Sequence, residues 1–346
     1  MRALVYGGPG RRSWTEAPDP TVGDPTDALL RIDTVTICGT DLHILGGDVP
    51  EVRPGRILGH EAVGTVLEVG SAVTSVRPGD RVLASCISAC GRCRYCREAR
   101  YGQCRSGGGW VLGHLLDGVQ AELARIPFAD LSLYPLPDEV TNEQAVVLAD
   151  IMPTSYEVGA LNGHVAPGDT VAIVGAGPIG LAAIRTVRLF SPLRIVVVES
   201  AAPRRRAAEE FGADVVLAPD NGVRDRIEAL TDGLGADVVL EAVGRPATFE
   251  LCAELVRPGG RLANIGVHGE PATLHLEQLW IKDVAFTTGL VDTYSIPTLL
   301  SMVAAGRLDT SGLITHRFAL DDIMTAYDVF ADPAGSGALK VALNRA

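Results

Sequence analysis

The first 150 residues of the chain carry short runs in which apolar and polar positions alternate or β-branched residues cluster. Residues 28–35 and 63–69 are examples, and glycine or proline turns separate such runs. A period of two is typical of half-buried strands, and Gly and Pro mark the turns between them. This part of the chain is therefore predicted to form a strand-rich domain.

A different pattern begins at Thr170, where apolar runs alternate with segments of helical periodicity. The predicted strands are 170–175, 194–199, 214–217, 237–244 and 261–266. The predicted helices between them are 179–190, 203–211, 223–231 and 248–255. Such alternation implies a parallel sheet covered by helices on both faces. The rhythm is lost after about residue 294, so the last segment is predicted to return to the first domain.

A chain of 346 residues exceeds the size at which one hydrophobic core usually stops growing, so two domains are expected. We predict an α/β protein with two parts. One is a strand-rich domain made of residues 1–152 and 295–346, and the other is a doubly wound parallel-sheet domain at 153–294.

Charge and hydropathy narrow the possible partners. The net charge of −12 and the pI near 5.1 argue against a protein that binds the nucleic-acid backbone, which would carry a basic face. No stretch approaches the roughly 18 consecutive apolar residues of a membrane span, and the start MRALVYGGPGRR lacks the apolar block of a secretory signal. We therefore expect a cytoplasmic protein with neither a nucleic-acid nor a membrane partner.

A glycine motif marks the start of the second domain. Gly175, Gly177 and Gly180, with Pro178 and Ile179 between the last two, follow the strand TVAIV and open the next predicted helix. Glycines at these places permit a tight turn, close approach of a pyrophosphate and close helix packing. Glu199 ends the following strand, where an acid can accept the ribose hydroxyls of a dinucleotide. The alternative is a glycine-rich turn with a solvated acid.

Four of the seven cysteines, namely Cys90, Cys93, Cys96 and Cys104, lie within fifteen residues. Short spacings of this kind let one loop wrap a tetrahedral ion, and zinc prefers thiolates in closed structural sites. The other possibilities are loose reduced cysteines or an iron–sulfur cluster, which ligand type alone does not exclude.

A second set of candidate ligands is spread along the first domain. It consists of Cys38 in ICGTDLH, His60 and Glu61 in GHEAVG, and Asp150 at the end of VVLAD. Each could be an ordinary core, surface or capping residue. Together they supply one sulfur, one nitrogen and one or two oxygens, which suits a catalytic zinc with an open position.

With these motifs the sequence resembles the zinc-containing medium-chain alcohol dehydrogenases over nearly its whole length. The block GHE with Gly64, Gly70 and Val73 is highly specific for that family. The resemblance implies a GroES-like catalytic domain and a Rossmann coenzyme domain. It also implies one zinc held by Cys38, His60 and Asp150, with Glu61 able to reach the metal, and a second zinc in the cysteine lobe. Asp150, where cysteine is frequent in the family, is as in the tetrameric bacterial secondary-alcohol dehydrogenases.

The same resemblance implies roles for further residues. Thr40 and His43 match the family's proton relay, Asp41 matches a residue that supports the zinc-bound histidine, and Arg204 matches a basic residue near the adenosine ribose. The walls of the substrate pocket are expected at Cys86, Ile87 and Trp110.

The predicted function is hydride transfer between an alcohol, with secondary alcohols favoured over primary ones, and a nicotinamide cofactor. Because Glu199 would repel a 2′-phosphate, we expect NAD to be preferred to NADP. The opposing evidence is Arg204, Arg205 and Arg206, since an arginine near the ribose can accommodate a 2′-phosphate. A homotetramer is expected from the resemblance. The alternatives are a polyol or amino-alcohol dehydrogenase of the sorbitol or threonine type, or a non-catalytic dinucleotide-binding protein.

Overall fold

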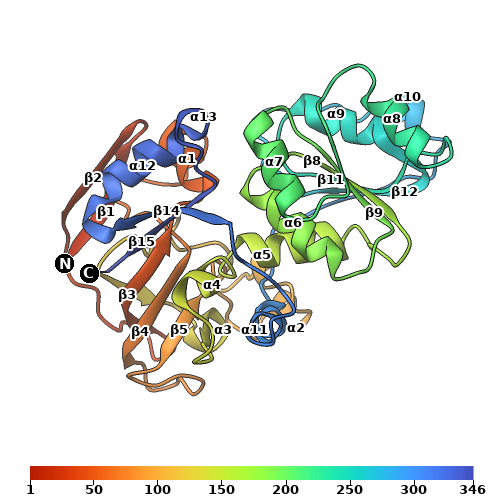
Figure 1. Ribbon diagram of the computed structural model, residues 1–346. Coiled ribbons are helices and arrows are strands. Elements are labelled where there is room, and N and C mark those ends of the chain that lie inside the picture. The colour runs from red at the N-terminus through yellow and green to blue at the C-terminus, as the bar shows by residue number, and fades with distance from the viewer. Residues whose placement is uncertain (346) are drawn as a thin grey trace. The chain divides into compact units, whose positions relative to one another are not determined.

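The computed structural model describes residues 1–345 and divides the chain into two compact units (Figure 1). Unit 1 is Met1–Asp150 with Val291–Ala346, and unit 2 is Ile151–Leu290. The boundaries predicted above, after residues 152 and 294, lie a few residues later and stay a prediction. Among the described residues no helix is both long and apolar enough to cross a membrane.

Unit 1 is built on a seven-stranded sheet in the order β14-β15-β3-β4-β5-β7, with β6 paired to β3. Its strands are β3 (Ala28–Thr36), β4 (Ala62–Val69), β5 (Arg81–Ala84), β6 (Leu123–Ile126), β7 (Leu133–Pro135), β14 (Ile314–Ala319) and β15 (Lys340–Asn344). A separate hairpin joins β1 (Arg2–Gly8) to β2 (Arg11–Glu16). Because β15 pairs with β3, the end of the chain lies inside the sheet that the first part builds.

The helices of unit 1 are short and lie in the connections between strands. They are α1 (Gly39–Gly46), α2 (Arg94–Arg97), η1 (Tyr101–Gln103), α3 (Ala129–Ser132), α4 (Asn142–Val146), α11 (Ile296–Ala304), η3 (Leu320–Asp322), α12 (Ile323–Ala331) and α13 (Pro333–Ser336). Helix α1 begins after Cys38, whose backbone N–H donates to the Asp41 carboxylate. It ends at Gly47, which has a φ of 90° that favours glycine.

Unit 2 contains a six-stranded sheet in the order β10-β9-β8-β11-β12-β13, in which every neighbouring pair is parallel. Its strands are β8 (Thr170–Val174), β9 (Arg194–Val198), β10 (Val215–Leu217), β11 (Ala236–Glu241), β12 (Val256–Asn264) and β13 (Ala285–Thr288). This is the strand order of a doubly wound dinucleotide-binding sheet, with the reversal between β8 and β11.

Helices cover both faces of this sheet, as the sequence predicts. They are α5 (Ile151–Thr154), the π-helical η2 (Ser155–Leu161), α6 (Pro178–Arg188), α7 (Ala202–Glu210), α8 (Val223–Leu230), α9 (Pro246–Leu255) and α10 (Leu276–Leu279). Side chains of α8 and α9 pack with Ala172 and Val174 of β8 in one core cluster. On the opposite face η2 approaches so closely that a Cβ on Gly159 would lie 3.5 Å from Leu240 of β11.

Candidate active site

Three ligand atoms from distant parts of unit 1 converge at one point. Asp150 Oδ2 lies 3.5 Å from Cys38 Sγ and 3.5 Å from His60 Nε2. Ligands held at about 2.0–2.3 Å from a tetrahedral zinc are separated from one another by roughly 3.3–3.8 Å. The spacing of these sulfur, nitrogen and oxygen atoms therefore fits a zinc ion, and the donor set leaves a fourth position open.

Local structure explains how each of these residues is placed. Cys38 is the N-cap of α1, His60 follows Gly59, whose φ of 92° turns the chain before β4, and Asp150 is the last residue of the first segment of unit 1. His60 is 3% exposed, so its imidazole is shielded from water while its Nε2 faces the other two ligand atoms.

The charges around His60 favour a bound cation. Burial alone would lower the pKa of His60, but its hydrogen bonds to Asp150 and Cys38, with the nearby charge of Asp41, raise this pKa well above its usual value. Burial raises the pKa of the Cys38 thiol, and the charge of Glu61 adds to that effect. A divalent ion bound at this point would balance the negative charge of the ionised Cys38 and Asp150 side chains, and its binding would release protons from the ligands.

Glu61 completes the group of possible ligands, all of whose donor atoms lie within 4.8 Å of one another, but its carboxylate has other partners. Lys340 Nζ of β15 donates to Glu61 Oε1 at 2.7 Å and to Oε2 at 2.5 Å, and the Thr36 hydroxyl donates to Oε2. Lys340 and Glu61 are 1% and 0% exposed. They form a fully buried ion pair directly beside the candidate ligand His60.

The two residues of the expected relay lie on α1. Thr40 Oγ1 is 3.6 Å from Cys38 Sγ, so the hydroxyl borders the ligand cluster. His43 lies one turn further along the helix, and its Nδ1 is 2.8 Å from the Asp48 carboxylate. Both members of that pair are partly exposed, with side-chain exposures of 39% and 53%.

The expected pocket residues lie near the ligand cluster to different degrees. The Trp110 ring packs edge-on against the His60 ring at a centroid distance of 6.3 Å and stacks on His114. Cys86 is joined to the cluster through its backbone, because its N–H donates to the carbonyl of Ala149, next to Asp150. Cys86 and Ile87 are buried to 4% and 1% exposure, so they can act as a wall behind the site or as core packing.

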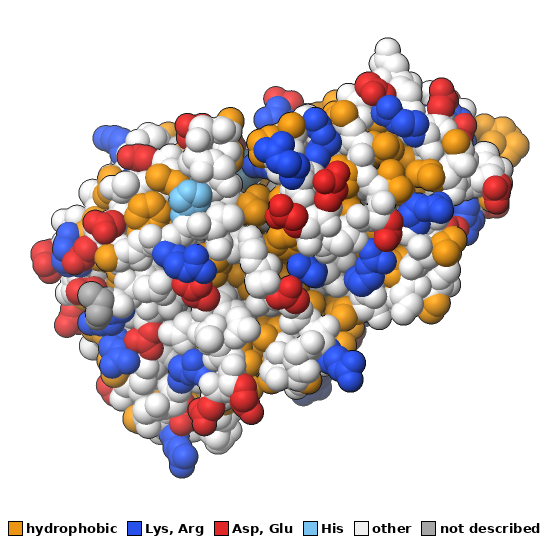
Figure 2. All heavy atoms as spheres, viewed as in Figure 1, with side chains coloured by type: hydrophobic (Ala, Val, Ile, Leu, Met, Phe, Trp, Pro, Cys, Tyr) orange, Lys and Arg blue, Asp and Glu red, His pale blue; other side chains and the backbone are white. Residues whose placement is uncertain are grey.

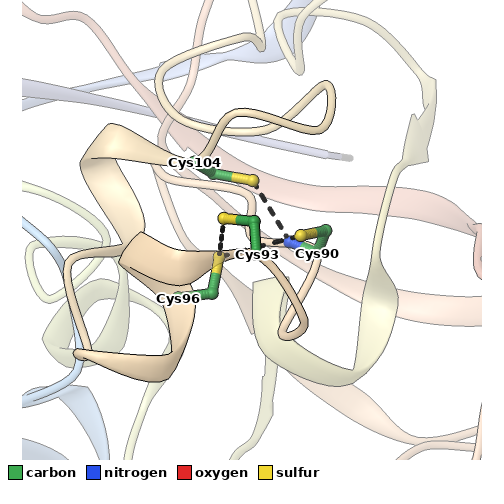
Figure 3. Close-up of side chains that lie close together, drawn as sticks. All are labelled: Cys90, Cys93, Cys96 and Cys104. Atoms are coloured by element: carbon green, nitrogen blue, oxygen red, sulfur yellow. Dashed lines mark hydrogen bonds between the residues drawn. The ribbon is translucent and has the colours of Figure 1, made fainter.

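The four clustered cysteines fold into one small lobe (Figure 3). Cys93 Sγ is 3.5 Å from Cys96 Sγ, Cys90 Sγ is 3.9 Å from the same atom, and the Cys90 N–H points at Cys104 Sγ. Burial opposes ionisation of Cys90, but hydrogen bonds from the N–H groups of Arg92 and Cys93 and from the side chains of Cys104 and Ser106 together outweigh it and lower the pKa of its thiol to about 6. Burial and the hydrogen bond with Cys93 raise the pKa of the Cys96 thiol to about 12, so thiolate character is stabilised at Cys90 and not at every cysteine of the lobe. The converging sulfurs and the thiolate character of Cys90 fit a closed structural zinc site.

Unit 2 presents the glycine motif as the sequence predicts, between β8 and α6. Gly175 has a φ of 103°, and a Cβ there would lie 2.5 Å from the side chain of Val243. Gly177 is the N-cap of α6, Pro178 is its first residue, Ile179 follows in its first turn, and a Cβ on Gly180 would overlap the carbonyl of Gly175. The helix N-terminus and its glycines thus leave room for a pyrophosphate.

Glu199 follows β9 and turns toward the glycine motif. It is 6% exposed, and its carboxylate accepts hydrogen bonds from the N–H groups of Ala176 and Ala201, each at 2.8 Å. The arginine side chains of α7 lie nearby, and Figure 2 shows basic side chains, in blue, over this helix. Arg205 Nη1 donates to the carbonyl of Glu199, and Arg204 Nη1 would be 4.0 Å from a Cβ on Gly177.

Comparison with known proteins decides the family. The model described as "Alcohol dehydrogenase GroES-like domain" matches residues 24–138, and the model described as "Zinc-binding dehydrogenase" matches residues 178–305. An alcohol dehydrogenase of Cupriavidus necator is 40% identical over 99% of this chain and 98% of its own length. The chain belongs to the zinc-containing medium-chain alcohol dehydrogenases.

Two further relatives agree with this assignment. The NADP-dependent isopropanol dehydrogenase of Thermoanaerobacter brockii is 36% identical, with 93% of this chain and 94% of that protein covered. The apo structure of zinc-dependent alcohol dehydrogenase 2 from Streptococcus pneumonia superimposes with a TM-score of 0.95 at 43% identity, covering 100% of this chain and 98% of that one. The predicted family and its fold, a GroES-like domain with a Rossmann domain, are confirmed, and this dehydrogenase is an enzyme acting on alcohols.

The structure also brings forward residues of this dehydrogenase that the sequence did not single out. Lys340 is one of two lysines in an arginine-rich chain, and a lysine inside the apolar run LKVAL is a signal of a buried charge with a partner. Thr36 and Asp48 carry no such signal, because only the fold brings them to Glu61 and His43.

Proposed function

We propose that this dehydrogenase interconverts small secondary alcohols and ketones with NAD, and primary alcohols less well, using a catalytic zinc on Cys38, His60 and Asp150. The observation that carries the proposal is the convergence of these three ligand atoms, with Asp150 Oδ2 3.5 Å from each of the other two, beside the Thr40 hydroxyl. The structural zinc is assigned to Cys90, Cys93, Cys96 and Cys104, which makes two zinc ions per chain.

When bound, the catalytic zinc supplies a Lewis acid that favours ionisation of an alcohol, and NAD supplies the nicotinamide ring that accepts its hydride. The chain's own residues do the rest. Thr40 is placed to accept the hydroxyl proton of the substrate while its own hydroxyl proton is released, and His43, which is partly exposed, can pass a proton on to solvent. Asp48 holds the His43 ring through Nδ1. In the reverse direction the same groups return the proton.

Metal analysis with two variants tests the proposal. The parent is expected to hold about two zinc ions per chain, one for each ligand set. His60→Ala should lose one zinc and all turnover of 2-butanol, while Cys93→Ala should lose the other zinc and mainly stability. A His60→Ala protein that is stable and fully active would refute the catalytic assignment.

The preference for NAD rests on Glu199. At about 4 Å and an effective dielectric near 20, the carboxylate and a 2′-phosphate would repel by roughly 4 kcal/mol, and solvent would reduce this to about 2–3 kcal/mol. That difference corresponds to roughly thirty- to hundredfold discrimination. Arg204 is the opposing group. Arg205 is occupied with main-chain carbonyls, which leaves fewer cations of α7 to compensate a phosphate.

A homotetramer in the cytoplasm completes the proposal. Strand β13 is at the edge of the unit 2 sheet, and exposed edges of this kind can pair with a second copy. Large apolar side chains are exposed on and around it, namely Leu276, Trp280, Ile281, Phe286 and Leu290. Their exposure supports burial against another subunit.

A further inference from the structure

A line of buried polar side chains leads from the candidate ligand His60 to helix α12. Its members are Asp41 on α1, Gln120 before β6, and Tyr327 on α12, which are 1%, 0% and 0% exposed. Three polar side chains from three separate segments are thus enclosed together. Such groups are kept in a protein interior only when they are hydrogen-bonded.

The hydrogen bonds run in one direction along the line. The Tyr327 hydroxyl donates to Gln120 Oε1 at 2.8 Å, and Gln120 Nε2 donates to Asp41 Oδ2 at 3.1 Å. The same Asp41 oxygen accepts the Cys38 N–H at 2.9 Å. Both donors to the Asp41 carboxylate among the described residues therefore reach Oδ2, and Oδ1 is left for another partner.

That partner is the ligand histidine. Asp41 Oδ1 lies 3.8 Å from His60 Nδ1, and neither atom has a hydrogen bond among the described residues. Two buried polar atoms facing each other in this way favour a hydrogen bond between them. A proton fixed on Nδ1 by that bond leaves the lone pair of Nε2 directed at Cys38 and Asp150.

The backbone next to His60 has glycines where the Gln120 side chain and its own segment approach it closely. A Cβ on Gly59 would lie 2.5 Å from Gln120 Cγ, and the φ of 92° at Gly59 also excludes most other residues. Gly118 approaches so closely that a Cβ there would overlap the carbonyl of Gly59. The chain thus brings Gln120 directly beneath the peptide that carries the ligand histidine.

We propose that Gln120 and Tyr327 are positioning residues of the catalytic metal site. Through two hydrogen bonds they fix the rotation of the Asp41 carboxylate, so that Asp41 Oδ1 faces His60 Nδ1 and holds the ring in the tautomer that binds a metal. This inference rests on the proposed zinc at His60. It extends that site to a residue 207 positions away from Gln120 in the sequence.

Tyr327→Phe tests the inference because it removes one hydroxyl and leaves the ring in the core. Zinc affinity is measured by equilibrium competition with a chromogenic chelator, and the His60 site is identified as the step absent in His60→Ala. Loss of outer support for a ligand histidine typically weakens metal binding about 10–100-fold, so a tenfold rise in the zinc dissociation constant of that step is expected. The cysteine-lobe step should not change.

Tyr6→Phe is the matched control, since Tyr6 is 3% exposed and belongs to the same core cluster as Tyr327. It should leave both zinc steps at the parent values. Gln120→Met removes the hydrogen bonds to Tyr327 and Asp41, together with the one that Gln120 Nε2 donates to the Thr36 carbonyl at 3.2 Å. It should weaken the His60 step at least as much as Tyr327→Phe.

Parent-like zinc affinity in Tyr327→Phe and Gln120→Met would overturn the inference. So would an equal loss at both zinc steps or an equal effect of Tyr6→Phe, since these indicate a general loss of packing. A parent protein without any zinc step that depends on His60 would overturn the proposed catalytic site itself, and that result is read from the parent and His60→Ala alone.

Discussion

The buried pair Lys340–Glu61 gives a sharp prediction about stability. Lys340→Met removes the ammonium group but keeps a side chain of similar length in β15. The Glu61 carboxylate, 0% exposed, would then keep the hydrogen bond from the Thr36 hydroxyl but lose its ion pair with the Lys340 ammonium group. An uncompensated charge in a protein interior is strongly unfavourable, so the variant should be much less stable than the loss of packing alone implies.

The expected magnitude follows from the burial of both partners. Breaking a buried pair by removing one member typically costs about 3–5 kcal/mol. For a domain of 150–250 residues each kcal/mol lowers the melting temperature by about 2–4 °C, so the transition of unit 1 should fall by roughly 6–20 °C. Replacing both partners with apolar residues is often close to neutral, so Glu61→Leu with Lys340→Met should recover much of the loss.

The measurement is thermal unfolding followed by circular dichroism, with both proteins stripped of metal so that zinc binding does not contribute. The matched control is Lys282→Met, which changes the only other lysine of the chain and should alter stability by no more than about 0.5 kcal/mol. If Lys340→Met and Lys282→Met have the same melting temperature, or if the double variant is less stable than Lys340→Met, the reasoning about a buried charge is wrong.

Three further outcomes are expected. Glu199→Gln keeps an acceptor for the Ala176 N–H but loses the charge, so the ratio of kcat/KM for NAD over NADP should fall by roughly thirty- to hundredfold, and equal use of both cofactors by the parent would contradict a role for Glu199. Cys86→Phe should lower kcat/KM for 2-butanol more than for 1-butanol because the ring takes the room of a second carbon substituent, and a parent that prefers 1-butanol, with no change in the variant, would count against this pocket. Light scattering should report a tetramer, and a monomer at working concentration would dismiss the assembly through β13.

The fold of this dehydrogenase could be predicted from its sequence because the signals are local. The apolar run at Thr170–Val174 is buried at every position, and the glycine motif follows it directly, so period and motif place the same element. The cysteine lobe is equally local, since its ligands lie within fifteen residues of one another.

The supports of the candidate metal site could not be predicted in the same way. Lys340 is 279 residues from Glu61, and Tyr327 is 207 residues from Gln120, so no spacing rule connects them. Lys340 meets Glu61 because β15 lies between β14 and β3 in the sheet, and Tyr327 meets Gln120 because α12 packs into the core of unit 1. Buried lysine and tyrosine are signs that a partner exists, but only the fold identifies it.

The interrupted course of unit 1 along the chain has a consequence for the order of folding. The whole of unit 2 lies in sequence between Glu61 and Lys340. It is therefore one long insertion, and unit 1 is complete only when the two ends of that insertion have come together. Closing a long loop is slow and costs conformational entropy, whereas unit 2 is continuous and can fold by itself. In a refolding experiment we therefore expect dinucleotide binding to recover first, and zinc affinity at His60 to recover only after β15 has joined the sheet.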